Sequence, residues 1–321
     1  MGDAALNLHR FAHEAMTVTF EAVIAHEDAV LARQAAGAAF EEVDRLERVM
    51  SRFDACSDIA RVNRMVPGDC VGVDIALFDC LLQAVELWAD TLGAFDITVG
   101  AVMKYKEVDN VPPAGPEGES HEDALNRVGM TRLIMDSEGF LVGLRKSDDG
   151  LSDGPVSLDL GAIGKGFALD KMVEVFDDWD IHNALVHGGT STVRVIGSPG
   201  AEGWPIAVGG PWAQAAGIEK VVLTGGALSG SGTQARGEHI IDPRTGRPAQ
   251  GPLAAWVICH TGAVADALST ALMVMSTDQA LSYCHQHPDI TALLVIPDDN
   301  APQGGRLERF GLAKNDYFEI F

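Results

Sequence analysis

The sequence predicts an α+β fold, a single large domain with a mixed or antiparallel sheet and flanking helices. The chain has 321 residues, of which 47% are hydrophobic and 6% aromatic, which is enough to bury a substantial core. Helical and strand-like stretches follow one another without the regular β-α-β-α alternation of a parallel sheet, and no internal repeat divides the chain. We expect one domain over residues 11–321, preceded by an N-terminal tail of residues 1–10.

Helix predictions rest on apolar residues that recur every three or four positions. Residues 29–52 place Phe40, Val43, Leu46 and Met50 at this spacing among Glu and Arg, which is typical of an amphipathic helix. The same spacing, or a run of strong helix formers, predicts four further helices. Their ranges are 75–91, 165–176, 263–275 and 278–285.

Strand predictions rest on short β-branched and aromatic stretches bounded by turn residues. Their ranges are 11–24, 131–135, 139–144, 156–160, 184–186, 192–196, 205–208, 220–224, 253–259 and 292–296. The glycines of residues 93–100 and 225–232 indicate turns between these elements, and residues 109–122, rich in proline and acids, indicate a surface loop.

The charge of the chain narrows the classes of partner. A formal net charge of −23 argues against a nucleic-acid backbone or an anionic membrane surface, because both require clustered Lys and Arg. The given N-terminus carries no signal peptide and no lipid-attachment cysteine, and no apolar stretch is long enough for membrane insertion. We therefore expect a cytoplasmic protein, in which an anionic nucleotide would need a metal ion or local donors.

Asp266 and Thr270 are candidate metal ligands. They lie four positions apart in a segment with strong helix propensity, so both side chains should occupy one helical face. A carboxylate and a hydroxyl are hard oxygen ligands of the kind that Mg²⁺ accepts while keeping sites open for water and phosphate. The alternative is an Asp near a helix start and a Thr facing the core, which is a frequent arrangement.

His239 and Asp242 are candidate acid–base residues. An imidazole near a carboxylate is oriented and made more basic, which suits a general base near neutral pH. The Asp242-Pro243 step favours a tight turn that Gly246 closes. A purely structural turn with an incidental histidine explains these residues equally well.

A glycine-rich turn between residues 157 and 166 precedes a predicted helix. Such turns expose backbone groups to ligands, and a helix N-terminus favours anions, so Lys165 within the turn is a candidate ligand-binding residue. The segment matches neither the Walker motif nor the dinucleotide fingerprint, and a plain connection is the alternative. The Gly188-Gly189 pair is a weaker signal of the same kind.

Taken in order, these segments resemble the ApbE family of FAD:protein FMN transferases. The two signatures of the family, His-x-x-Asp-Pro-x-Thr-Gly and Ala-Asp-Ala-x-x-Thr-Ala, are intact at residues 239–246 and 265–271. Three further motifs match at Ala15-Met16, at residues 93–100 and at residues 159–170. The resemblance implies an ApbE-like, T-fold-related domain and a reaction in which FMN moves from FAD to a Thr or Ser hydroxyl of a target flavoprotein, with release of AMP.

By position in these motifs, the resemblance implies a role for each candidate residue. His239 would be the general base, assisted by Asp242. The metal ion, Mg²⁺, would be held by Asp266, Thr270 and the backbone carbonyl of Ala162. The binding site of FAD, which is the substrate, would be lined by Met16, Phe95, Asp96, Lys165, Gly188, Gly189 and Thr190.

Three departures from the family pattern concern FAD affinity rather than the metal and base positions. Thr17 and Val18 replace the usual Gly-Thr, Thr190 replaces an Asp, and Leu228 replaces a Thr. Two alternatives to the transferase stay open from the sequence. One is an FAD pyrophosphatase that yields FMN and AMP, and the other is a flavin-binding or storage protein without turnover.

Overall fold

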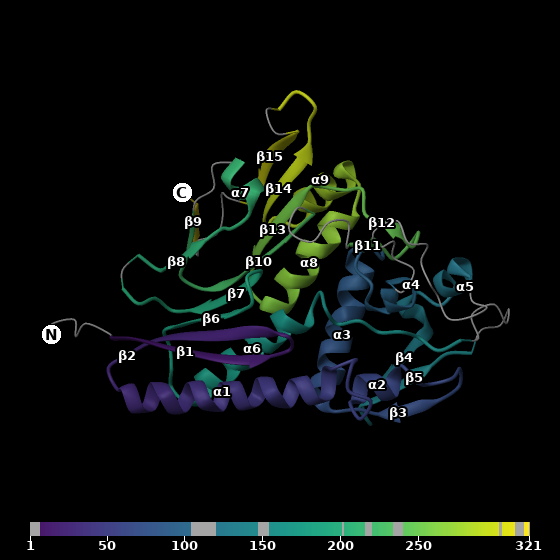
Figure 1. The fold of residues 1–321 in the computed structure, drawn as a ribbon, viewed down its shortest axis with the longest axis horizontal. Helices are drawn as coiled ribbons and strands as arrows, with labels where there is room; N and C mark the ends of the chain where they lie inside the picture. Colours follow the sequence, from purple (N-terminus) through teal and green to yellow (C-terminus); the bar gives the residue numbers. More distant parts are fainter. Residues whose placement is uncertain are drawn as a thin grey trace. The chain divides into compact units, whose positions relative to one another are not determined.

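The computed structural model describes residues 7–103, 120–146, 154–200, 202–215, 220–233, 240–301, 304–311 and 318–320 (Figure 1). The chain forms two compact units. The first comprises Met1–Arg45, Lys165–Gly237 and Gly251–Phe321, and the second comprises Leu46–Gly164 and Glu238–Gln250. Helices pack on antiparallel sheets, so the predicted α+β class is confirmed.

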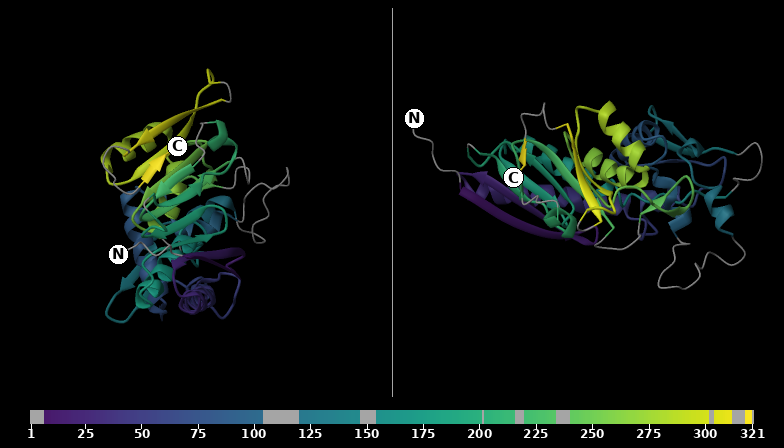
Figure 2. Two further views of the ribbon diagram at one scale, coloured as in Figure 1. Left: turned by 90° about the vertical axis from the view of Figure 1, so that its left-hand side faces the viewer. Right: turned by 90° about the horizontal axis from the view of Figure 1, so that it is seen from above.

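An eight-stranded antiparallel sheet organises the first unit, in the order β1-β2-β6-β7-β10-β13-β14-β15. Its strands run from the purple β1–β2 hairpin at one edge to the yellow β15 at the other (Figure 2). Their bounds are β1 Asn7–Ala15, β2 Val18–His26, β6 Ala184–Gly188, β7 Thr192–Ile196, β10 Gly226–Gly232, β13 Ala254–Cys259, β14 Thr291–Pro297 and β15 Gly305–Phe310.

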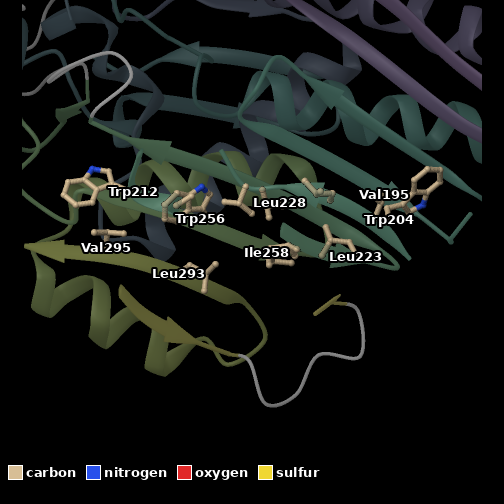
Figure 3. Packing of buried hydrophobic residues seen from close by; sticks show 14 of the residues in the cluster. Val195, Trp204, Trp212, Leu223, Leu228, Trp256, Ile258, Leu293 and Val295 are labelled. Carbon is tan, nitrogen blue, oxygen red and sulfur yellow. The ribbon is translucent and has the colours of Figure 1, made fainter. Parts of the chain in front are cut away.

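One face of this sheet carries an apolar core. The first unit also contains a three-stranded sheet and the short helix α7 (Pro211–Ala215). The strands of this sheet are β8 (Trp204–Ala207), β9 (Lys220–Leu223) and β16 (Phe318–Ile320). Trp204, Trp212 and Trp256 belong to one buried cluster with the aliphatic residues labelled in Figure 3. Indole rings contribute large buried areas, so these three residues account for much of the apolar burial on this face.

Helices lie against the other face of the sheet. The helix α8 (Gly262–Val274) packs on β7, β10 and β13. The helix α6 (Gly164–Asp178) contacts α8 at Gly166 and Gly262, and α9 (Thr277–Gln286) packs on β14. The long α1 (Ala29–Met50) contacts β1, since Asp44 pairs with His13 at 2.6 Å and Phe40 stacks on the same imidazole.

The central strand β10 was predicted as a glycine-rich turn, and that prediction is wrong. Glycine and serine have low β-propensity, but the neighbouring strands require small residues here. Gly230 lies directly opposite Trp256, and a Cβ at this glycine would overlap the indole. Alternate positions are serines, Ser229 and Ser231, which face α8.

Residues 11–24 form two strands rather than the single predicted strand. Met16 and Thr17 make a two-residue turn with φ of 48° and 65°, and β1 already begins at Asn7, inside the expected tail. Such a turn has positive φ at both central residues, which favours Asn-Gly. A β-branched residue with positive φ is strained, so nothing in Met-Thr signals a turn.

Replacing Thr17 by Gly is expected to stabilise the protein by about 1 kcal/mol. Relief of the strained backbone, about 1–2 kcal/mol, exceeds the cost of the extra freedom that glycine gains in the unfolded chain. The measurement is the denaturant midpoint of unfolding. In the matched control Thr19→Gly, within strand β2, the midpoint should fall, and a fall for Thr17→Gly as well would show that the turn is unstrained.

The second unit holds a small sheet, several short helices and a hairpin. The sheet order is β3-β5-β4, which confirms the strands predicted near residues 131–144. The elements are α2 Asp58–Val62, β3 Cys70–Gly72, α3 Ile75–Asp90, η1 Ile97–Val99, α4 Gly100–Met103, α5 His121–Leu125, η2 Met130–Arg132, β4 Leu133–Asp136, β5 Leu141–Leu144, β11 Ile241–Asp242 and β12 Arg247–Pro248.

The predicted strand at 156–160 is wrong. Its backbone groups bond to a side chain and to η1: the Asn63 side chain accepts from Leu158 N and donates to Leu158 O, and Asp159 N donates to Ile97 O. The predicted helices correspond to α1, α3, α6, α8 and α9 within two residues at either end. Of the predicted loop, residues 109–119 lie outside the described residues, while His121 begins α5.

Among the described residues, no helix has the length and apolar character that a membrane crossing requires.

Candidate functional site

Asp266 lies at the centre of a polar cluster in the first unit. Its side chain comes from α8 and the residue is only 4% exposed. One carboxylate oxygen, Oδ2, accepts from Lys165 Nζ at 3.2 Å and Gly166 N at 3.3 Å. The other, Oδ1, accepts from Thr192 Oγ1 at 3.1 Å and Ser229 Oγ at 3.2 Å. A buried carboxylate needs such partners, and α6, β7 and β10 together supply them.

Thr270 follows Asp266 by one helical turn. Its Oγ1 donates to the backbone carbonyl of Asp266 at 3.4 Å and lies 3.4 Å from Ser231 Oγ. Ser231 Oγ is also 2.9 Å from Ser269 Oγ. The same side of α8 therefore presents a carboxylate and a row of hydroxyls to β10, as the four-residue spacing predicted.

A second carboxylate, the partly buried Asp170 of α6, contacts the start of α8. Its Oδ1 accepts from Gly262 N at 2.7 Å and Arg194 Nε at 3.2 Å, and its Oδ2 accepts from Ala263 N at 2.9 Å. Desolvation raises the pKa of Asp170, and the two backbone amides and the Arg194 guanidinium oppose that rise.

Four of the predicted flavin residues of the first unit lie at the tips of two adjacent hairpins, while Lys165 lies at the start of α6. Met16 belongs to the β1–β2 turn, Gly188 ends β6, and Gly189 and Thr190 belong to the β6–β7 connection. Gly189 N donates to Thr19 O at 2.9 Å, and Gly189 has a φ of 63°, which favours glycine. A Cβ at Gly189 would meet the Val18 side chain at 3.4 Å, so the two tips are in contact.

The His187 ring fixes the second of these tips. Its Nδ1 is 3.0 Å from the Gly189 carbonyl, and its Nε2 is 3.4 Å from a carboxylate oxygen of Glu21, the residue opposite it on β2. The Gly188-Gly189 turn is thus held from β2 as well as from its own strand.

Other predicted site residues belong to the second unit. Asp242 caps the turn after it: its Oδ1 accepts from Arg244 N and Nε, both at 2.9 Å. Gly246 N closes the turn on Asp242 O at 2.8 Å, as the Asp-Pro step predicted. Ile241 belongs to one apolar cluster with Val102 of α4, and Val99 of the 93–100 motif packs against this cluster, so the motif and the Asp242 turn share it. His239 lies outside the described residues, and Ala162 lies in the turn that precedes α6.

Phe95 and Asp96 are both buried in the second unit. Asp96 caps η1, since its Oδ1 accepts from Thr98 N at 2.7 Å and Thr98 Oγ1 at 2.5 Å. Desolvation raises the pKa of Asp96, while the Thr98, Met130 and Trp88 donors act in the opposite direction. Its carboxylate therefore stabilises the start of η1, the helix that directly follows Phe95 and Asp96.

Sequence reasoning missed Thr192 and Ser229 as partners of Asp266. The two are directly opposite on β7 and β10, with hydroxyl oxygens 3.0 Å apart. A signal was available at β7, where Thr192 and Arg194 alternate with Val193 and Val195 and therefore share one face. No comparable signal marked Ser229, because its strand was taken for a turn.

The fold and this cluster define a class: α+β proteins whose antiparallel sheet supports a buried, lysine-paired aspartate beside glycine-rich turns. The model of the ApbE family matches residues 16–294 of the chain. Because that match covers most of the sequence, the chain belongs to the ApbE family.

Curated relatives and solved structures agree with the family. A relative from Haemophilus influenzae, named FAD:protein FMN transferase, is 28% identical over 267 residues, covering 78% of this chain and 75% of the relative. One of the same name from Treponema pallidum is 28% identical over 284 residues, covering 81% and 78%. The ApbE protein of Thermotoga maritima superposes with a TM-score of 0.77 at 28% identity, over 95% of this chain and 98% of that one. The chain is therefore an enzyme of the transferase class.

Proposed function

We propose that the protein transfers FMN from FAD to a Thr or Ser hydroxyl of a target flavoprotein, releases AMP, and requires Mg²⁺. The observation that carries the proposal is the placement of Asp266, with Thr270 one turn away, beside Lys165 at the start of α6. This cluster contains two of the motifs that match the family, and the names of the curated relatives supply the substrates.

The donor set suits Mg²⁺ in its chemistry. Asp266 offers a carboxylate and Thr270 a hydroxyl, both hard oxygen ligands, and the main-chain carbonyl of Ala162 is the proposed third. Across the described parts of the chain, no three His, Cys, Asp or Glu side chains gather as a metal cluster. When bound, the ion supplies charge neutralisation at the phosphates of the pyrophosphate.

Each of the site residues has its own role in the proposed reaction. The acceptor oxygen attacks the phosphorus of the FMN half, the bond from that phosphorus to the AMP oxygen breaks, and the acceptor proton passes to His239. Asp242 keeps the turn after His239 in place through its bonds to Arg244. Lys165 and the backbone amides at the start of α6 favour the anionic pyrophosphate, as helix N-termini do.

AMP release from FAD in the presence of Mg²⁺ tests this function. The reaction is run with and without an acceptor peptide that carries a Thr/Ser flavinylation motif, and the mass of the peptide is read in parallel. AMP with an FMN-modified peptide is the expected result. AMP with free FMN and an unmodified peptide would make the enzyme a pyrophosphatase, and FAD binding without AMP would make it a storage protein.

Replacing His239 by Ala is expected to lower transfer about 100- to 10,000-fold, the usual contribution of a general base. FAD binding should stay within about threefold, because the proposed role concerns the acceptor proton alone. Single-turnover transfer and flavin fluorescence titration measure the two quantities. As a control, His285→Ala, on the exposed side of α9, should change neither. Transfer at the wild-type rate by His239→Ala would remove this residue from its role.

A further inference from the structure

The helices α6 and α8 contact each other through their backbones at two glycines. A Cβ at Gly166 would overlap the carbonyl of Gly262, and a Cβ at Gly262 would overlap the carbonyl of Gly166. The approach is therefore reciprocal, and each helix brings a residue without a side chain to the contact. Only glycine permits main chains to come this close.

Four residues after each of these glycines, each helix carries an aspartate, which is buried at Asp266 and partly buried at Asp170. Residues four apart share a helical face, so the sequences Gly166-Phe-Ala-Leu-Asp170 and Gly262-Ala-Val-Ala-Asp266 each present a glycine and a carboxylate on one side. Asp266 of α8 accepts from Gly166 N of α6, and Asp170 of α6 accepts from Gly262 N of α8. Each helix thus caps the first turn of the other.

The two carboxylates differ in their cationic partner. Asp266 faces Lys165 Nζ at 3.2 Å, whereas Asp170 faces Arg194 Nε at 3.2 Å. The Arg194 guanidinium also donates to the carbonyls of Val195 and Gly226, so its position on the sheet is fixed. Asp170 is therefore held to the sheet by a guanidinium, whereas Asp266 contacts the sheet through the Thr192 and Ser229 hydroxyls and pairs with the ammonium of Lys165.

We propose that Asp170 is a positioning residue for the metal site: it fixes the start of α8 against α6 and thereby sets the place of Asp266 and Thr270. Both of its oxygens must accept, because Gly262 N bonds to Oδ1 and Ala263 N to Oδ2. Asparagine would point an amide donor at one of these N–H groups. The inference rests on the proposed function, since it concerns the same metal ligands.

The test compares Mn²⁺ affinity, by paramagnetic resonance titration, with thermal stability and with amide exchange over residues 262–270. Asp170→Asn should weaken Mn²⁺ binding about 10-fold, as loss of an orienting partner typically does, and should speed exchange in this segment. The matched control is Asp178→Asn, an exposed aspartate on the same helix, which should match the wild type in all three. Titrations are made at a temperature where every variant is folded.

A purely stabilising role for Asp170 predicts a different result, a lower melting temperature with unchanged Mn²⁺ affinity in the folded protein, and that result would overturn the inference. Arg194→Lys is the milder variant if Asp170→Asn does not fold. It keeps the charge but loses the guanidinium fork, and it should weaken Mn²⁺ binding in the same direction.

The Asp266→Asn variant separates a wrong metal assignment from a wrong role for Asp170. If Asp266→Asn binds Mn²⁺ as the wild type does, the metal assignment itself is wrong and the inference falls with it. If Asp266→Asn loses binding while Asp170→Asn and Arg194→Lys keep it, the inference alone is wrong.

Discussion

Replacement of Asp266 by Asn is expected to lower FMN transfer about 1000-fold and to remove its dependence on Mg²⁺. The substitution keeps the size of the side chain but removes the one carboxylate proposed as a ligand. Neutralisation of a reacting phosphate by a metal ion lowers the activation free energy by several kcal/mol, and each 1.36 kcal/mol changes the rate about tenfold. Rates measured over a range of Mg²⁺ concentrations check this result.

Stability must be separated from catalysis in this experiment. An asparagine side chain at this position would offer only one acceptor oxygen to the four donors that Asp266 now serves, and each buried donor left unsatisfied costs about 1–3 kcal/mol. The melting temperature is therefore measured in parallel, with Asp278→Asn, exposed on α9, as the control. A folded Asp266→Asn variant whose activity still rises normally with Mg²⁺ would show that the metal binds elsewhere.

Replacement of Gly166 by Ala should have the largest effect on stability, a loss of about 3 kcal/mol or more. The added Cβ would overlap main-chain atoms of Gly262 and Ala263, and a backbone cannot move aside by changing rotamer. Separating the two helices would also lengthen the bond from Gly166 N to Asp266, so transfer should fall in the folded variant. Denaturant unfolding and transfer assays measure the two effects.

Gly164 provides the matched control two positions earlier in the same helix. A Cβ there would meet only the Leu160 side chain, at an ordinary 3.5 Å. Gly164→Ala should therefore change the free energy of unfolding by less than about 1 kcal/mol, with a gain expected from the higher helix propensity of alanine. Equal losses for the two variants would show that the Gly166–Gly262 contact is not the cause.

The sequence predicted the helices well because their apolar periodicity is long and regular. It also predicted that Asp266 and Thr270 would share a helical face, and that the Asp242 turn would be tight. These features depend on residues close together in the chain. Local spacing is sufficient for them.

The errors arose where distant neighbours decide the conformation. Strand β10 is extended because Trp256 and Thr192, on the flanking strands, pair with its glycine and serine residues. The hairpin turn at Thr17 exists although the residue is strained there, since nine residue pairs join β1 to β2. Composition alone cannot reveal a conformation that a partner strand imposes.

For the same reason the partners of Asp266 could not be found from the sequence. Thr192 lies 74 positions from it and Ser229 lies 37 positions from it. Only the order of the strands in the sheet makes them neighbours. Asp170 was part of a matched motif, but its contact with the start of α8 depends on a crossing of helices that no pattern within either helix specifies.

The interleaving of the two units bears on how the chain acquires its fold. Strand β2 pairs Phe20 with Gly188, so the sheet cannot extend past its first hairpin until the intervening 46–164 segment has been synthesised. The unit that contains this segment also includes residues 238–250, so it cannot be completed until they have been synthesised. High contact order of this kind slows folding and leaves the unpaired edge of β2 exposed on a nascent chain. We therefore expect fragments that end before residue 251 to aggregate when they are expressed alone.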